Sequence, residues 1–457
     1  MTRPAALGGP VRVAILGAGG RGHDAYGEWI LHHPDVATIA AVADISAHRR
    51  DALADRAELP DAARFDSWSA LLDRAVELDL GAVIVALPDT DHVEPALRAA
   101  GLGLPTLLEK PVAVSIDALR TLTDASTGLE GLITVGHVLR YTPFWRTVAE
   151  IVSSGAIGAL TTINLEENIG FWHFAHSYVR GNWRRSDLSS PVVLAKTGHD
   201  LDLIRWLAGE PPERISSLGS LSYFREANAP AGSPAYCLDG CPVQDECPFY
   251  APRYYAEALA ARRGWPVALL GHDTSLEGRL TALRDGPYGR CVFHSDNDVP
   301  DHQQTVLGFP SGLTATLSMS ALTGENTRTV HLTGTRGELR GHLSSGRLEV
   351  DLFSPHGALG PLPFAAVTRS STRSPMGHCA VELQVQASED AEGDHRGHDG
   401  GDAGLMSAFL ANITAAAAGE VLGTGLSSAL DSHWMAFAAE ESRLSGRTVQ
   451  WPTNPGG

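Results

Sequence analysis

Three side chains in this sequence, Lys110, Lys196 and His199, have the types and spacing that proton transfer requires. Lys110 follows the apolar run 106–108, which predicts a buried strand, so its ammonium is expected at the carboxyl edge of a parallel sheet, where open α/β sheets bind ligands. Lys196 and His199 lie three residues apart in a segment predicted to be helical, and residues at that spacing share one helix face. Imidazole titrates near neutral pH, and an ammonium can stabilise an oxyanion. We therefore expect these side chains to share a site of proton transfer.

A glycine-rich turn follows the first apolar run, residues 11–16. It fits the pattern G-x-G-x-x-G, in which the first glycine permits a tight turn, the second lets the backbone approach a phosphate, and the third packs the next helix against the strand. Free N–H groups at the start of that helix attract an anion. The residues expected to bind the pyrophosphate of a dinucleotide are Gly17, Gly19, Gly20, Arg21 and Gly22.

A second apolar run, residues 38–43, ends in Asp44, which lies 22 residues beyond Gly22. At this position a carboxylate can accept a hydrogen bond from the 2′-hydroxyl of the adenosine ribose, and it would repel a 2′-phosphate. Asp44 therefore favours NAD over NADP as the cofactor. The alternative interpretation is that Asp44 only caps the helix that follows.

The composition restricts the partners and the compartment. The formal net charge of −18 repels nucleic acid and anionic membranes. No apolar run reaches the ~18 residues that span a bilayer, and residues 1–10 lack the apolar core of a signal peptide. We expect a cytoplasmic protein of two domains, with no nucleic-acid or membrane partner and with its five cysteines reduced.

Hydrophobic patterning divides the chain into two kinds of α/β structure. The first third alternates apolar strands at 82–87 and 106–108 with helices at 46–59 and through Ala100, as a doubly wound parallel sheet requires. Later runs are short, rich in β-branched residues and separated by turn residues, which predicts an antiparallel sheet. These runs are residues 160–165, 304–309, 313–319, 329–332 and 337–341.

The glycine turn, Asp44, the segment Pro88–His92 and above all Glu109-Lys110-Pro111 resemble the Gfo/Idh/MocA oxidoreductases, named for glucose-fructose oxidoreductase and inositol dehydrogenase. The resemblance implies an N-terminal Rossmann domain and a C-terminal α/β domain with a large open, mostly antiparallel sheet. We expect an NAD-binding domain at 1–140 and a substrate and oligomerisation domain at 141–457. The tail, residues 429–449, resembles the family's helix that returns to the nucleotide domain. A homodimer or homotetramer formed through the open sheet is also implied.

The same resemblance implies roles for further residues. Residues 136–141 resemble the crossing into the second domain, and residues 198–207 resemble the active-site helix. Lys110 is expected to contact the substrate hydroxyl. The family has an aspartate four residues before the active-site histidine, and this chain has Ala195 at that position. The histidine therefore loses its usual carboxylate partner, so the detailed site of inositol dehydrogenase is not expected here. Asp200 and Asp202 are expected to stabilise the first turns of the helix. The residues added to the cofactor site are Pro88, His92, Glu109 and Lys110.

The stretch 170–185 is dense in aromatic rings, histidines and arginines, which suit a pocket for a polar, ring-shaped or anionic substrate. Packing under a loop is the alternative for the aromatic residues. His173 and His176, at i and i+3, are a second alternative as metal ligands, although no third ligand accompanies them. With Lys110 and His199, the substrate-binding candidates are Tyr141, Trp172, His173, Arg180, Trp183 and Arg184.

An insertion at about 222–298 carries four of the five cysteines. We expect the pattern C-x3-C-x5-C and one distant cysteine to bind a structural zinc ion as four thiolates. The proposed ligands are Cys237, Cys241, Cys247 and Cys291. An iron–sulfur cluster and buried free thiols are the alternatives. Residues 387–404 predict a surface loop, in which residues 398–402 resemble a glycine-rich loop found in part of the family.

The leading functional prediction is an NAD-dependent dehydrogenase that removes hydride from a secondary hydroxyl of a sugar, cyclitol or sugar derivative. An alternative is an NAD-dependent glycosidase that oxidises a sugar hydroxyl transiently, eliminates the aglycone, adds water and reduces the product. A non-catalytic NAD-binding regulator is a third class, which Lys110, Lys196 and His199 disfavour. Fold resemblance does not identify the substrate.

Overall fold

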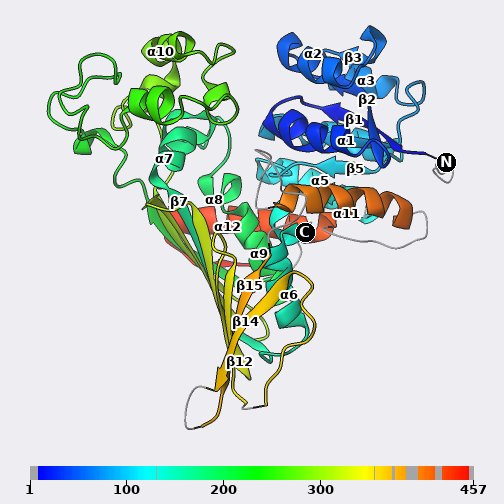
Figure 1. Ribbon diagram of the computed structural model, residues 1–457, viewed down its shortest axis with the longest axis vertical. Coiled ribbons are helices and arrows are strands. Elements are labelled where there is room, and N and C mark those ends of the chain that lie inside the picture. Colours follow the sequence, from blue (N-terminus) through cyan, green and yellow to red (C-terminus); the bar gives the residue numbers. More distant parts are fainter. Residues whose placement is uncertain are drawn as a thin grey trace.

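The computed structural model describes residues 9–129, 131–354, 356–372, 376–386, 400–416 and 425–451. Two sheets organise these residues, with the first sheet and the cysteine-bearing insertion side by side above the second sheet (Figure 1). None of the described helices is long and apolar enough to cross a membrane.

The first sheet has six parallel strands in the order β3-β2-β1-β4-β5-β6, which is the strand order of a dinucleotide-binding Rossmann fold. The central strand β4 is wholly buried and β1 is buried except at Arg12, as their apolar runs predict. The strands are β1 Val11–Leu16, β2 Ala37–Ala43, β3 Arg64–Phe65, β4 Ala82–Val85, β5 Thr106–Leu108 and β6 Ile133–Val135. The helices are α1 Glu28–His32, α2 Ala47–Arg56, α3 Trp68–Asp73, α4 Val93–Gly101 and α5 Ile116–Leu129.

The second sheet has ten strands in the order β14-β15-β13-β12-β11-β7-β10-β9-β8-β16. Within this second sheet, the pairing of β7 with β10 is the only parallel one among the described strands, so the predicted large, mostly antiparallel sheet is confirmed. The five predicted runs belong to β7 Leu160–Gly170, β9 His302–Gly308, β10 Thr314–Thr323, β11 Thr327–Gly334 and β12 Gly337–His342. The others are β8 Arg214–Ser220, β13 Arg347–Leu352, β14 Ala365–Thr372, β15 Cys379–Val385 and β16 Val449–Gln450.

Helices cover one face of the second sheet. α6 Pro143–Ser153 and α9 Gly198–Ala208 lie on that face in Figure 1, and α12 Leu426–Ser445 packs against β8 and also against α5 and α9. α12 thus contacts α5 of the first domain as well as the second sheet. His433 of α12 completes the junction because its Nε2 accepts a hydrogen bond of 2.8 Å from the N–H of Val112, two residues after Lys110.

The insertion is short of regular structure. Between Ser222 and Asp298 its only α-helix is α10 Leu276–Asp285. Its residues contribute to two small hydrophobic clusters that are separate from the main core. One of these clusters also contains residues of α7 Phe171–Phe174 and of the π-helix Ala175–Arg180, so the insertion packs on the aromatic stretch.

Two local expectations need correction. Residues 387–399, including His398 and Asp399 of the predicted loop, lie outside the described residues, but Gly401 and Asp402 begin the helix α11 Gly401–Ala416. The predicted helical face shared by Lys196 and His199 is also wrong. The structure has a short helix, α8 Val192–Ala195, and then α9 from Gly198, so the helix is interrupted between the two side chains.

Candidate functional site

The glycine turn after β1 has the backbone that a dinucleotide site needs. Gly17 has φ of +93°, and a Cβ there would lie 2.3 Å from the carbonyl oxygen of Ala86. A Cβ on Gly22 would lie 1.8 Å from the oxygen of Gly17. Gly19 has no atom within 4 Å of its Cβ position, so its backbone is open to a phosphate. The following segment, Gly20–Gly27, is a π-helix rather than the first turn of an α-helix.

Asp44 stands at the end of β2 and faces this turn. Its carboxylate accepts hydrogen bonds from the N–H groups of Ala18 and Ser46 at 2.9 and 2.8 Å, and from the Arg49 guanidinium at 2.8 and 3.1 Å. Burial would raise the pKa of Asp44, but the donors of Arg49, Ser46 and Ala18 outweigh it and hold the pKa below its usual value. Asp44 is therefore a carboxylate beside the glycine turn, and Arg49 is a neighbour that sequence reasoning missed.

Arg21 and Glu109 form a buried cluster with two residues from distant segments. The Arg21 guanidinium donates to Glu109, to the Tyr26 hydroxyl at 2.6 Å and to Asp402 of α11 at 2.7 Å. The Tyr26 hydroxyl also donates to Glu109. Burial would raise the pKa of Glu109, but the charge of Arg21 outweighs it and lowers the pKa. Arg21 thus connects the glycine turn to Glu109 and to α11. No pattern in the sequence predicted its contact with Asp402.

Lys110 lies where the sequence predicts, beyond the carboxyl end of β5. Its Nζ donates a hydrogen bond of 2.9 Å to the carbonyl oxygen of Ala195, and its own N–H donates to Glu109 at 2.9 Å. Burial lowers the pKa of the Lys110 ammonium, although Glu109 opposes that effect. The first domain thereby contacts the segment immediately before Lys196. His92 lies at the same edge of the sheet. Its two ring nitrogens lie within hydrogen-bond distance of the carbonyl oxygens of Leu87, which precedes Pro88, and of Pro111, which follows Lys110.

Lys196 belongs to a buried ionic network. Its Nζ lies 3.0 Å from Oε1 of Glu167 on β7, and the guanidinium of Arg328 on β11 bridges Glu167 and Asp200 at 2.7 Å each. Burial raises the pKa of Asp200 to about 6, with Arg328 opposing. Asp200 therefore anchors α9 to the sheet instead of only stabilising a helix end. Sequence reasoning missed Glu167 and Arg328 because they lie on distant strands.

His199 is buried on α9 beside a second histidine. Its ring lies 5.8 Å, edge to face, from the ring of His137, which follows β6. Burial lowers the pKa of His137 well below its usual value, and the charges of Arg140 and Lys110 add to that effect. Arg140 in turn makes a bidentate ion pair with Asp202 at 2.6 and 2.7 Å. The imidazole of His199 thus lies beside His137, a residue whose pKa the charge of Lys110 also lowers.

The aromatic stretch borders this region through α7. Trp172 and His173 stack on each other, and both rings contact Trp265 of the insertion at 6.2 and 5.2 Å. Trp183 donates from Nε1 to Asp89, after β4, at 2.9 Å. This bond connects the stretch directly to the nucleotide domain.

The predicted substrate-binding residues separate into two groups. Arg180 is 2% exposed and donates to the carbonyl oxygens of Phe249 and Arg290, both at 2.7 Å, so it does not face the Lys110 region. Arg184 pairs with Asp296 at 2.8 Å, and Tyr141 packs at the edge of the main core. By contrast, Trp172, His173 and Trp183 lie at the border between the insertion and the remainder of the site.

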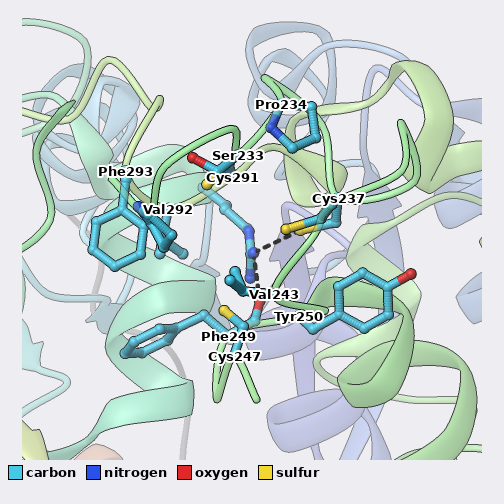
Figure 2. Close-up of a pocket in the computed structure, with 13 residues that line it drawn as sticks. Ser233, Pro234, Cys237, Val243, Cys247, Phe249, Tyr250, Cys291, Val292 and Phe293 are labelled. Carbon is cyan, nitrogen blue, oxygen red and sulfur yellow. Dashed lines mark hydrogen bonds between the residues drawn. The ribbon is translucent and has the colours of Figure 1, made fainter. Parts of the chain in front are cut away.

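The predicted metal ligands converge, but not as a zinc site. Cys237, Cys241, Cys247 and Cys291 line one pocket in the insertion (Figure 2). In the described part of the chain, however, no three His, Cys, Asp or Glu side chains are arranged to hold a metal ion, so the zinc prediction is not supported. His173 and His176 do not form a metal site either, because they bond separately to Asn326 and Tyr255.

The rarity of lysine in the sequence also marks this site, and the sequence-based predictions did not use it. Of the 35 lysines and arginines, only two are lysines, and these are Lys110 and Lys196. Lysine differs from arginine in having a compact ammonium whose pKa shifts readily on burial. A chain that uses arginine at every other cationic position has kept an ammonium at these two.

Comparisons with known proteins agree with the fold. Residues 11–137 match the family model described as "Oxidoreductase family, NAD-binding Rossmann fold", and residues 145–246 match the GFO/IDH/MocA C-terminal domain. The Bacillus subtilis protein YteT is 28% identical over 331 residues, which cover 71% of this chain and 70% of that protein.

An inositol 2-dehydrogenase of Rubrobacter xylanophilus is 32% identical over 213 residues, covering 45% of this chain and 54% of that enzyme. The chain thus aligns with only about half of this relative's length. The solved levoglucosan dehydrogenase, in complex with NADH and levoglucosan, superposes with a TM-score of 0.65 at 16% identity, covers 97% and 100% of the two chains, and shows the shared fold. The chain belongs to the Gfo/Idh/MocA family and is an NAD-binding oxidoreductase.

Proposed function

We propose that this enzyme transfers hydride to NAD from a secondary hydroxyl of a sugar, cyclitol or sugar derivative. The observation that carries the proposal is the contact between Lys110 and the carbonyl of Ala195 at 2.9 Å. It brings the chain's two lysines to one place at the carboxyl edge of the first sheet, where an open α/β sheet binds its ligands. The relatives named as inositol dehydrogenases support a polyhydroxylated ring as the substrate class.

In this proposal each side chain has one role. His199 accepts the hydroxyl proton as hydride leaves the carbon, because a neutral imidazole is available near pH 7. Lys110 donates a hydrogen bond to the oxygen as negative charge develops on it. Glu167 holds Lys196 at 3.0 Å, where its ammonium adds a second positive charge to the site. Trp172 and His173 supply apolar and polar contacts to a sugar ring. The glycine turn would hold NAD, which would supply the hydride acceptor when bound.

The test follows cofactor and product together. The enzyme is incubated with NAD and a panel of sugars, cyclitols and glycosides, and NADH is measured along with the products. A dehydrogenase accumulates NADH in step with substrate loss. Release of free sugar from a glycoside without net NADH, and with exchange of the α hydrogen for solvent deuterium, would replace this proposal by the oxidation–elimination alternative.

Substitutions test whether Lys110 and His199 take part in the proposed reaction. We expect Lys110→Met and His199→Ala each to lower kcat/KM by about 10²–10³-fold, as loss of a group that stabilises the transition state does. Lys110→Arg should not restore full activity, because a guanidinium is a larger, planar group than the compact ammonium. Arg98→Met, at an exposed ion pair on α4, is the matched control and should leave turnover unchanged. Near-native activity of both site variants would show that the site is elsewhere.

Two broader proposals accompany this one. We propose a cytoplasmic location, which the five cysteines support because none of them forms a disulfide, as is usual in a reducing compartment. We also propose that the enzyme forms a homodimer or homotetramer through the uncovered face of the second sheet, where Leu218 and Val306 are 74% and 48% exposed.

A further inference from the structure

Four of the five cysteines gather in the insertion, and the fold fixes their positions through backbone bonds. The N–H of Cys237 donates to Gly289 and that of Cys291 donates to Ala235, both at 2.9 Å, so these two cysteines lie on neighbouring segments. The N–H of Cys247 donates to Val243 at 2.9 Å, which places Cys247 on a tight loop after Cys241. The sulfurs of Cys237, Cys247 and Cys291 come from three loop segments and face a common space (Figure 2).

Hydrogen-bond donors point at these sulfurs. The backbone N–H of Phe249 donates to Cys247, and that of Phe293 donates to Cys291, two residues further along in each case. Nη2 of Arg180 lies 3.7 Å from Sγ of Cys237. Burial raises the pKa of the Cys247 and Cys291 thiols, and these hydrogen bonds oppose that rise without reversing it. Hydrogen bonds to sulfur also tune metal-bound thiolates, whereas cysteines that only fill a core do not require them.

Arg180 adds an independent observation, because it is a buried cation without a buried anion. Its side chain is 2% exposed, and it donates to two carbonyl oxygens and to Cys237. No carboxylate within the described residues lies at ion-pair distance from it. A buried charge is costly unless it is paired. An anionic group in the cysteine pocket would supply the missing counter-charge.

The arrangement also distinguishes between kinds of metal centre. A zinc ion bonds each thiolate at about 2.3 Å, so it requires all four sulfurs within about 4 Å of one another. No such group exists among the residues that the structure describes. A cubane iron–sulfur cluster instead carries its cysteines at four separated corners, around a body of iron and sulfide. Cys241 and Cys247 are each followed by proline, as is the last cysteine of the ferredoxin pattern.

We infer that Cys237, Cys241, Cys247 and Cys291 bind a [4Fe–4S] cluster, with Arg180 as its counter-ion. Each thiol loses its proton when it binds iron, and the resulting four-thiolate centre is negatively charged. It would therefore neutralise the buried guanidinium of Arg180. The cluster's role is structural. It would hold together an insertion of little regular structure and fix the π-helix of Arg180, which continues α7 with Trp172 and His173. This inference does not depend on the proposed reaction.

The test is metal analysis of the full-length chain purified without oxygen. We expect about four iron atoms and four acid-labile sulfides per chain, with broad visible absorption that dithionite bleaches. Cys247→Ser should lose most of this iron, whereas Cys379→Ser, which changes the one cysteine outside the pocket, should keep it. Arg180→Lys, which preserves the charge, should retain more cluster than Arg180→Met.

Two results would overturn the inference. One is stoichiometric zinc in place of iron in the anaerobic wild-type protein. The other is the absence of iron and sulfide both after anaerobic purification and after reconstitution with ferrous iron and sulfide. Both metal analyses use the wild-type chain, so they remain valid even if a cysteine variant fails to fold.

Discussion

At the scale of single residues, we propose that the contact between Asp44 and Arg49 governs the choice between NAD and NADP. The carboxylate that can bind the ribose 2′-hydroxyl of NAD is also held by two donors of Arg49, at 2.8 and 3.1 Å. An arginine near this position accommodates the 2′-phosphate of NADP in other Rossmann domains. In this proposal Asp44 has two effects: it offers an acceptor to NAD, and it pairs with Arg49.

We expect Asp44→Ala to weaken NAD binding about 10- to 100-fold, because a hydrogen bond to a charged group contributes roughly 1.5–3 kcal/mol. The same change frees Arg49, so NADP should bind as well as or better than in the wild type. Titration calorimetry with both cofactors measures the two effects. In the double variant Asp44→Ala, Arg49→Ala the gain for NADP should disappear. A wild-type protein that binds NADP as tightly as NAD would contradict this role of Asp44.

At the scale of elements, α12 joins the two halves of the site through His433. Its Nδ1 lies 2.8 Å from the carbonyl oxygen of Ala429, and its Nε2 accepts from the N–H of Val112 at 2.8 Å, which defines a neutral tautomer. Burial lowers the pKa of His433 to about 3, and the neighbouring His137 adds to that effect. A proton on Nε2 would abolish the bond to Val112 and so loosen the loop that carries Lys110.

This contact makes stability depend on pH in a defined direction. Between pH 6.5 and about 3 the unfolded chain binds a proton at His433 and the folded chain does not, so the free energy of unfolding falls as pH falls through this window. The loss approaches about 1.4 kcal/mol per pH unit for one such histidine. His433→Gln keeps an acceptor but does not titrate. Its stability should fall less than that of the wild type between pH 7 and pH 5.

Urea unfolding at several pH values measures this difference. His356→Gln, at an exposed histidine, is the control and should follow the wild-type curve. Parallel pH profiles for His433→Gln and the wild type would mean that His433 is already protonated in the folded protein, or that it does not bind Val112.

At the scale of the whole molecule, the uncovered face of the second sheet is the feature that one chain does not explain. α12 covers the inner side of β8, where Ser217 donates its N–H to Ser442. On the opposite side Leu218, Val306 and their neighbours Gln304 and Thr316 share one exposed face of β8, β9 and β10. A broad, flat sheet face with exposed apolar side chains is typical of a subunit interface.

We expect Leu218→Glu and Val306→Glu each to shift the protein toward monomer, because a carboxylate would be buried unpaired between two sheets. Light scattering coupled to size-exclusion chromatography measures the mass. Leu444→Glu, at a position 71% exposed on α12, is the control and should leave the mass unchanged. A wild-type chain that elutes as a monomer at micromolar concentration would exclude this interface.

The sequence by itself determined the features that depend on local pattern. The apolar runs predict the strands β1, β2, β4 and β5 because a strand buried on both faces must be apolar throughout. The glycine turn and Asp44 follow from backbone geometry at fixed spacing. Lys110 could be placed at the sheet edge because it directly follows β5.

Only the tertiary structure decided which charges meet. Arg21 and Asp402 are 381 positions apart, and Glu167 reaches Lys196 from a different element, so no periodicity in the sequence connects them. The same reason explains the errors. The sequence pattern predicts that Arg180 binds substrate, but in the folded protein its side chain is buried among the cysteines. The predicted helix between Lys196 and His199 is interrupted where Lys196 binds Glu167 and Asp200 binds Arg328. Ion pairs between distant segments form only when the whole fold brings them together, because local spacing determines the conformation of a segment but not its neighbours.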